Sequence, residues 1–148
     1  MKIIVATDGS EFSRAAVEEC CRLIVNPKET KIKVVSVYPA VLPLDEFPDS
    51  LNYAEKQQEV EQQNAKKYVN QAQKILLKHF PDLEIATETL NGSTDHQLIE
   101  CARQWKAELI IVGSHGRGFW GRLIIGSVAD SLVHHSPCSV LIVRKSES

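Results

Sequence analysis

Short apolar runs alternate with stretches of helical periodicity along the whole chain, and this alternation restricts the fold more than any other feature. Runs typical of strands occupy residues 2–7, 31–38, 83–90, 108–112 and 139–144. In 83–90 the apolar residues alternate with polar ones, which is the pattern of a strand solvated on one face. Between them, apolar residues recur about every 3.6 residues, as they do on one face of an amphipathic helix. Strands that follow one another through helices form parallel, right-handed crossover units. The sequence therefore predicts an α/β fold in which helices flank a doubly wound, mostly parallel sheet of five strands.

The intervening stretches differ in how clearly they indicate a helix. Residues 50–79 form the longest one, with an apolar stripe in the second half and a first half rich in Gln, Glu and Lys. The charges of that first half are typical of a solvated helix face. The preceding segment, 39–49, holds three prolines and is predicted to be a loop. Shorter helices are expected from Ser10 or Ser13 to about Asn26, from Ser93 or Thr94 to about Lys106, and over 127–135.

Length and composition limit the classes of function that need to be considered. A chain of 148 residues predicts one domain, 1–148, without an internal repeat. The net charge of −2 offers no electrostatic reason to expect a nucleic acid partner. No apolar run approaches the roughly 18 residues of a membrane span, and the start lacks the pattern of a signal peptide. We therefore expect a cytoplasmic protein. The four cysteines have no metal-binding spacing and are expected to behave as small core residues.

Residues 113–127 combine five glycines with two arginines and no acidic residue, directly after the apolar run 109–112. Glycine lets the backbone approach a ligand closely, so that several N–H groups can converge on one anion. The stretch leads into a helix that begins near Ser127, and the N-terminus of a helix favours phosphate. Ser127 is suited either to cap this helix or to bond a phosphate oxygen. The stretch predicts a phosphate-binding loop, and the alternative is a purely structural connection between strand and helix.

Two glycine patterns overlap in this loop and predict different ligands. Residues 116–121 match G-x-G-x-x-G, but they neither follow the strand directly nor precede an acidic residue at the spacing of a dinucleotide site. The wider pattern G-x2-G-x9-G-S, formed by Gly113, Gly116, Gly126 and Ser127, is complete. Together with residues 3–10 and the closing P-C-S-V-L-I-V-R, it resembles the universal stress protein family, whose ATP-binding members carry the wider pattern.

This resemblance spans the chain and implies a specific architecture and ligand. It implies a Rossmann-like sheet of order 3-2-1-4-5 with helices on both faces, and ATP as the bound nucleotide. It also implies a homodimer that pairs through the last strand, 138–143. Because ligands of open α/β sheets bind where the strand order reverses, the ends of the first and fourth strands are expected to line the site.

The candidate binding residues follow from the resemblance and from this rule. The resemblance implies that Val37 faces the adenine edge and that the wider glycine pattern, with its two neighbouring valines, contacts ribose and phosphates. Asp8 is a candidate for bonding the nucleotide or a metal carried by the triphosphate, Mg²⁺ or Mn²⁺. Arg117 is a candidate for offsetting phosphate charge. The complete set is Ala6, Thr7, Asp8, Val37, Val112, Gly113, Gly116, Arg117, Gly126, Ser127 and Val128.

The leading functional hypothesis is a cytosolic, ATP-binding stress-response regulator with at most slow ATP hydrolysis. No catalytic residue is predicted, because nothing around His115 suggests a nucleophile with its base, and G-x-x-x-x-G-K-[ST] is missing from the sequence. No metal-ligand cluster is predicted either. Two alternatives remain: an ATP-using transferase on the same scaffold, and a dimeric interaction module that binds no nucleotide. ATP or ADP, and a second copy of the chain, are the expected partners.

Overall fold

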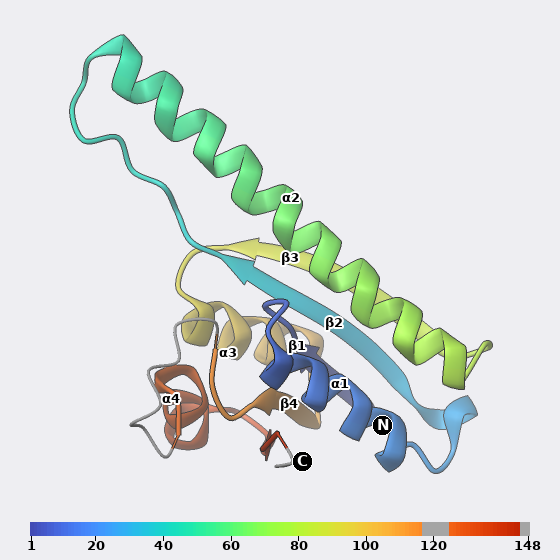
Figure 1. Ribbon diagram of the computed structural model, residues 1–148. Coiled ribbons are helices and arrows are strands. Elements are labelled where there is room, and N and C mark those ends of the chain that lie inside the picture. The colour runs from blue at the N-terminus through green and yellow to red at the C-terminus, as the bar shows by residue number, and fades with distance from the viewer. Residues whose placement is uncertain (117–124, 146–148) are drawn as a thin grey trace.

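The computed structural model describes residues 1–116 and 125–145, which form a five-stranded sheet flanked by helices (Figure 1). The strands are β1 (Lys2–Ala6), β2 (Lys31–Tyr38), β3 (Glu84–Asn91), β4 (Leu109–Gly113) and β5 (Ser139–Val143). The helices are α1 (Glu11–Leu23), α2 (Pro48–His79), α3 (Thr94–Trp105) and α4 (Ser127–His135), with a 3-10 turn, η1, at Pro27–Glu29. The sheet order is β3-β2-β1-β4-β5 and each neighbouring pair is parallel. The predicted fold class and strand order are confirmed.

Two apolar layers cover the two faces of the sheet, because successive strand residues point to opposite sides. Ile3 and Val5 face a cluster built with α1 and α2, which includes Val17 and Leu76. Ile4, between them in β1, faces the second cluster, to which α3 and α4 contribute Leu98 and Leu132 among others. β1 is thus buried on both faces, which explains its uninterrupted apolar sequence.

The expected role of the cysteines agrees with this core. Cys20, Cys21 and Cys101 are buried and Cys138 is partly buried, all as free thiols. Burial raises the pKa of the Cys20 thiol to about 12 and that of Cys101 to about 11. Such thiols stay protonated at neutral pH, and they therefore pack as small apolar groups.

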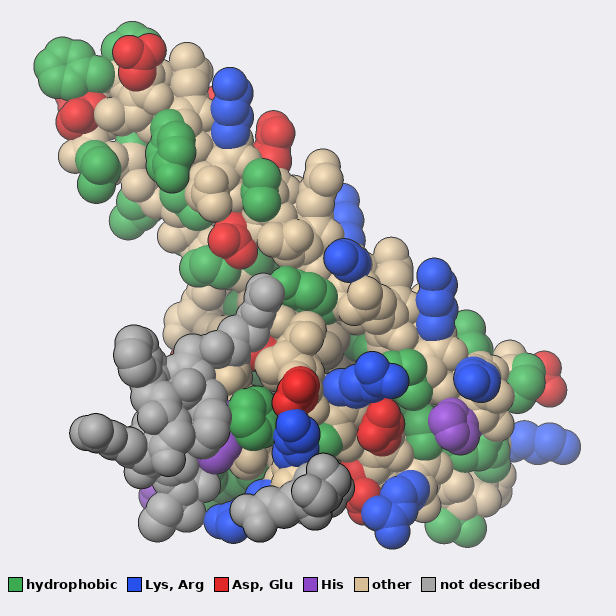
Figure 2. Space-filling view, viewed as in Figure 1, with side chains coloured by type: hydrophobic (Ala, Val, Ile, Leu, Met, Phe, Trp, Pro, Cys, Tyr) green, Lys and Arg blue, Asp and Glu red, His purple; other side chains and the backbone are tan. Residues whose placement is uncertain are grey.

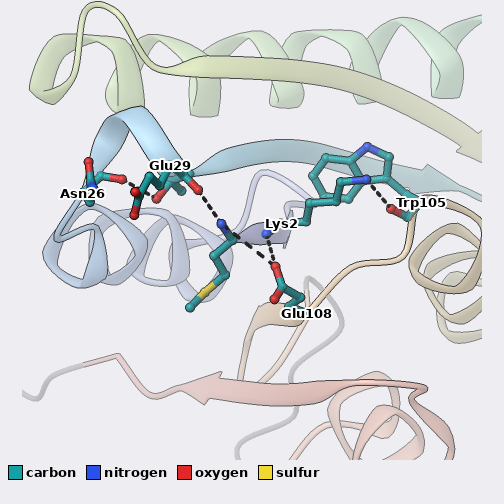
Figure 3. Close-up of polar contacts among 7 residues, drawn as sticks. Lys2, Asn26, Glu29, Trp105 and Glu108 are labelled. Carbon is teal, nitrogen blue, oxygen red and sulfur yellow. Dashed lines mark hydrogen bonds and ion pairs between the residues drawn. The ribbon is translucent and has the colours of Figure 1, made fainter.

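Polar contacts secure the N-terminal end of the central strand (Figure 3). The backbone N–H of Lys2 donates to the Glu108 carboxylate at 2.8 Å, and its ammonium donates to the Trp105 carbonyl at 3.2 Å. The terminal amino group donates to the carbonyl of Glu29. These bonds lie at the N-terminal end of β1. The candidate site is expected at the opposite end of the strand, so these residues do not form part of it.

Helix α2 differs from the prediction at its start. The loop was expected to extend to Asp49, whereas the helix begins at Pro48 and continues without a break to His79. Proline is favoured at the first helical position, because its fixed φ suits the helix and the N–H it lacks would have no helical partner there. The third proline of the segment therefore starts the helix rather than prolonging the loop.

Candidate functional site

The C-terminal ends of β1 and β4 lie side by side where the strand order reverses. Val5 is in register with Ile111. From these ends the chain leads to α1 on one face of the sheet and toward α4 on the other. The divergence leaves a cavity of about 320 Å³, a volume typical of small-molecule sites. The residues that line it are Ala6, Thr7, Asp8, Ser13, Val35, Val37, Thr94, Leu98, Val112, Gly113, Ser114, His115, Gly116, Gly126, Ser127, Val128 and Ala129.

The loop after β1 is shaped by bonds among its own polar groups. The Asp8 carboxylate accepts from the N–H of Ser10 at 2.9 Å, and Ser10 caps α1 by accepting from the N–H of Ser13 at 3.2 Å. Of the two predicted caps, Ser10 is therefore the one used. The hydroxyls of Thr7 and Ser13 lie 3.2 Å apart, and both side chains are largely buried. These bonds hold the carboxylate of Asp8 at the cavity wall.

The three glycines of the wider pattern meet different neighbours. A Cβ on Gly113 would lie 2.6 Å from the backbone carbonyl of Phe12 in α1. A Cβ on Gly126 would lie 3.0 Å from the carbonyl oxygen of Ser114, which accepts the N–H of Gly126 at 2.7 Å. A Cβ on Gly116 would lie 3.1 Å from the Oδ2 of Asp8, the nearest described atom. Two of the glycines thus permit close backbone packing, and the third lies beside the carboxylate of Asp8.

Helix α4 begins at the cavity and presents its N-terminus to it. Gly126 is the N-cap residue, and no described side chain caps this end. The suggestion that Ser127 caps the helix is wrong, because Ser127 is already the first helical residue. The first N–H groups of a helix have no partner within it, and together with the helix dipole they attract an anion. Since Ser127, Val128 and Ala129 all line the cavity, this wall is suited to phosphate.

Another part of the cavity wall is apolar and comes from the sheet and α3. Ala6, Val37 and Val112 are contributed by the ends of three neighbouring strands, and Leu98 by α3. Apolar side chains of this kind suit a flat, weakly polar ring such as a nucleobase. The cavity therefore combines one surface for a ring with another for an anion.

The structure brings together all the candidate residues that it describes. Every described member of the predicted set lines the cavity. Arg117 lies outside the described residues, as do Phe119, Trp120 and Arg122. Sequence reasoning did not include seven other lining residues: Ser13, Val35, Thr94, Leu98, Ser114, His115 and Ala129. Ser114 and His115 could have been found from their place between two motif glycines. Thr94 and Leu98 carry no such signal, since they reach the site through the packing of α3.

His115, for which no catalytic role is predicted, lines the cavity. Its Nδ1 is 2.9 Å from the hydroxyl of Ser114, and its ring is 5.2 Å from that of Phe12 in a tilted arrangement. These contacts orient the imidazole from two sides.

A polar contact joins α3 to α4 beside the cavity. The Asp95 carboxylate accepts from the hydroxyl of Ser131 at 2.7 Å and from that of Ser93 at 2.5 Å. A further bond comes from the N–H of His96. These hydrogen bonds lower the pKa of Asp95 to about 2. Asp95 therefore remains charged at neutral pH and fixes the helix whose first turn lines the cavity.

The described residues, 1–116 and 125–145, lack two further features. They contain no cluster of three or more His, Cys, Asp or Glu side chains arranged to hold a metal ion. Within the same residues, no helix has the length and apolar character that crossing a membrane requires.

Comparison with known sequences identifies a family. The sequence model of the universal stress protein family matches residues 1–144. A universal stress protein of Methanocaldococcus jannaschii is 31% identical over 147 residues, which cover 97% of this chain and 82% of that protein.

Solved structures with the same fold include several universal stress proteins. UspA from Lactobacillus plantarum superposes with a TM-score of 0.82 at 23% identity, over 97% of each chain. A universal stress protein in complex with cAMP gives a TM-score of 0.67 at 23% identity, over 99% of this chain and 98% of the other. A family member from Arabidopsis thaliana with AMP bound gives a TM-score of 0.64 at 16% identity, over 99% of this chain and 92% of the other.

Proposed function

Because the chain belongs to the universal stress protein family, we propose that it is a cytosolic regulatory protein that binds ATP in the cavity between β1 and β4. The observation that carries this proposal is the pairing, in one cavity, of an apolar wall with a helix N-terminus that no described side chain caps. An adenine nucleotide has the matching division into a flat base and an anionic phosphate chain. The bound cAMP and AMP in two solved universal stress proteins support an adenine nucleotide as the ligand.

In this proposal each wall of the cavity has one task. Val37 and Val112 hold the base, as the apolar strand ends of the sheet. Gly113, Gly116 and Gly126 let the backbone approach the ribose and phosphates, and the first N–H groups of α4 bind the phosphate oxygens. Arg117 remains a proposed source of positive charge, although it lies outside the described residues.

A divalent metal would enter with the triphosphate. Asp8 is the one carboxylate among the described residues that line the cavity. A single carboxylate together with phosphate oxygens and water is a usual Mg²⁺ environment, and Mn²⁺ accepts similar ligands. Asp8 would therefore contribute one ligand to the metal, whose charge would offset that of the phosphates.

Occupancy of the cavity would be transmitted through the loop after β1. A Cβ on Gly9 would lie 2.4 Å from the ring of Tyr68 in α2, so the residue beside Asp8 packs tightly against the long helix. A nucleotide that repositions Asp8 therefore acts on a loop in contact with α2. This contact supports the proposed role of the nucleotide as a conformational switch.

Homodimerisation through residues 138–143 is part of the same proposal. Strand β5 lies at one edge of the sheet, and among the described residues β4 is the one strand that pairs with it. The carbonyl of Val143 accepts from the N–H of Ser114, so Val143 points toward β4. The backbone N–H and C=O groups of successive strand residues point alternately to the two sides of the strand. Val140 and Ile142 therefore present their backbone groups to the open edge. A second copy could pair with those groups.

The test begins with the nucleotide that accompanies the purified protein. The protein is denatured, any released nucleotide is identified by chromatography, and ATP affinity is measured by calorimetry on the emptied protein. We expect ATP or ADP from the wild type, and at least about tenfold weaker binding in Gly126→Val, which places a branched side chain against Ser114 and His115. Val133→Ser is the matched control, since Val133 is an exposed residue of α4 that does not line the cavity.

Two results would contradict the proposal. The first is a folded wild type that releases no nucleotide and shows no calorimetric binding of ATP, which would favour an interaction module. The second is an unchanged ATP affinity in a folded Gly126→Val protein. Phosphate release measured with the same samples then determines whether hydrolysis is slow or undetectable.

A further inference from the structure

Residues 39–61 form a projecting arm, which consists of the segment 39–47 and the first turns of α2 (Figure 1). The helix has 32 residues, a length of about 48 Å at the usual rise. Strands β2 and β3 have eight residues each, or about 26 Å. The helix is therefore much longer than the sheet it covers. Its residues in the core cluster are Val69, Ala72 and Leu76, all in the second half.

The arm is held together by specific contacts. The side chain of Gln58 accepts from the N–H of Val41 at 2.7 Å and donates to the carbonyl of Pro39 at 3.4 Å. Asn91, at the end of β3, donates to the same carbonyl at 3.4 Å. Ala54 is only 6% exposed. These contacts fasten the segment 39–47 along the helix, so that the arm has a defined surface.

Large apolar side chains are exposed on this surface. Leu44 is 98% exposed, Leu42 80%, Phe47 71% and Tyr53 67%. Val60 and Leu51 are also exposed. Outside the arm, the other strongly exposed apolar residues of the described chain are Met1, Leu23, Val25 and Val133. They are scattered along the sequence, whereas the arm concentrates six within 19 positions. A concentration of this kind marks an interaction surface.

The same surface is strongly acidic. Between 39 and 61 there are six acidic residues and one lysine, a net charge of −5 within a chain whose total is −2. Figure 2 shows hydrophobic and acidic side chains together at the end of the arm. Among the described residues, none of these carboxylates takes part in an ion pair. The acidic residues are Asp45, Glu46, Asp49, Glu55, Glu59 and Glu61.

Charge decides which occupant fits this surface. Two arms placed together would bring like charges into contact, which disfavours a second copy docked arm to arm. An anionic lipid surface would be repelled for the same reason. We propose that the arm docks a partner protein through a basic amphipathic helix, whose apolar face covers Leu44 and Phe47 while its Lys or Arg residues meet the acidic side chains.

The test uses the full chain and a defined probe. The probe is a fluorescein-labelled synthetic peptide of leucine and lysine that forms an amphipathic helix, and binding is followed by fluorescence anisotropy. Two control peptides separate the contributions. One replaces every lysine by glutamate, and the other replaces every leucine by serine. We expect the first peptide to bind, with an affinity that falls as salt is raised, and both control peptides to bind far more weakly.

Variants locate the binding to the arm. Leu44→Ser with Phe47→Ser removes the apolar part, and Asp45→Asn with Glu46→Gln removes two charges. Each pair is expected to weaken binding by about tenfold or more. The matched control is Leu23→Ser with Val25→Ser, because these apolar residues are exposed at the end of α1, outside the arm. It is expected to bind as the wild type does, and circular dichroism verifies that every variant is folded.

Three results would overturn the proposal. The first is no binding of the leucine–lysine peptide to the wild type, and the second is binding that the arm variants do not change. The third is concentration-dependent self-association that Leu44→Ser with Phe47→Ser abolishes, since a second copy would then be the occupant. None of these results depends on the nucleotide, so the proposals for the arm and the cavity stand or fall separately.

Discussion

Replacing Gly113 by alanine tests whether this glycine serves the packing of the fold rather than the flexibility of the loop. The added Cβ would lie 2.6 Å from the carbonyl carbon and oxygen of Phe12, where ordinary contact begins at 3.4 Å. These are backbone atoms in the first turn of α1 and cannot turn aside as a flexible side chain would. To accept the methyl group, α1 would have to withdraw from β4 by about 0.8 Å.

The expected loss of stability follows from two opposing effects. Overpacking in a well-packed interior costs about 1–3 kcal/mol. Replacing glycine in a strand returns roughly 0.5–1 kcal/mol, because the unfolded chain loses conformational freedom. We therefore expect Gly113→Ala to lower the free energy of unfolding by about 1–2 kcal/mol. For a chain of this size the midpoint of urea denaturation should fall by about 0.5–1 M.

Gly116→Ala is the matched control for this experiment. A Cβ on Gly116 would lie 3.1 Å from the Oδ2 of Asp8, the end of a side chain that has to shift by only about 0.3 Å to reach ordinary contact. The free energy of unfolding of the Gly116→Ala protein should therefore stay within about 0.5 kcal/mol of the wild-type value. Both variants are unfolded in urea after removal of nucleotide, because a bound ligand would add its own stabilisation. A Gly113→Ala protein as stable as the wild type, or two equally destabilised variants, would refute the reasoning.

Three further predictions concern other parts of the molecule. Gly9→Ala should lower the free energy of unfolding by about 1–3 kcal/mol, because Gly9 has φ of +78° and faces the Tyr68 ring. Thermal unfolding measures this effect, and an unaffected melting temperature would contradict the prediction. Asp95→Asn should cost about 1 kcal/mol at pH 7, after allowance for solvent screening. Because the folded-state pKa of Asp95 is lowered from 3.8 to about 2, this advantage is present above the unfolded pKa and is lost as the pH falls through the folded value. The free energies of unfolding of the two proteins, measured by urea titration, should therefore converge as the pH falls toward 2. A difference between them that does not change with pH would exclude the Asp95 carboxylate as its source. Ile142→Pro should convert a dimer to monomers, as measured by light scattering. Strand β5 should stay folded, since proline is tolerated where the N–H faces an open edge. A dimer that persists in this variant would place the interface elsewhere.

Most of the secondary structure could be predicted because it depends on local periodicity. The apolar run of β4 and the helical stripe of α1 each signal their own element. Helix α4 begins and ends at the predicted residues, Ser127 and His135. The predicted start of α2 was wrong because Pro48 suits both a loop and a first helical turn. The local sequence does not distinguish these two contexts. The first half of α2 lacks an apolar stripe, since no sheet lies beneath it.

The sequence by itself determined the strands, the helices and the glycine spacing, because each of these depends on residues near one another in the chain. Tertiary structure alone decided which further residues join the predicted set at the cavity. Thr94 and Leu98 reach it because α3 packs over the sheet, and Asp95 secures α4 through Ser131, which lies 36 positions further along the chain. The acidic, apolar surface of the arm likewise exists only because the segment 39–47 folds back along α2. Such contacts bring together residues whose local sequence carries no record of the pairing, and only the packed chain creates them.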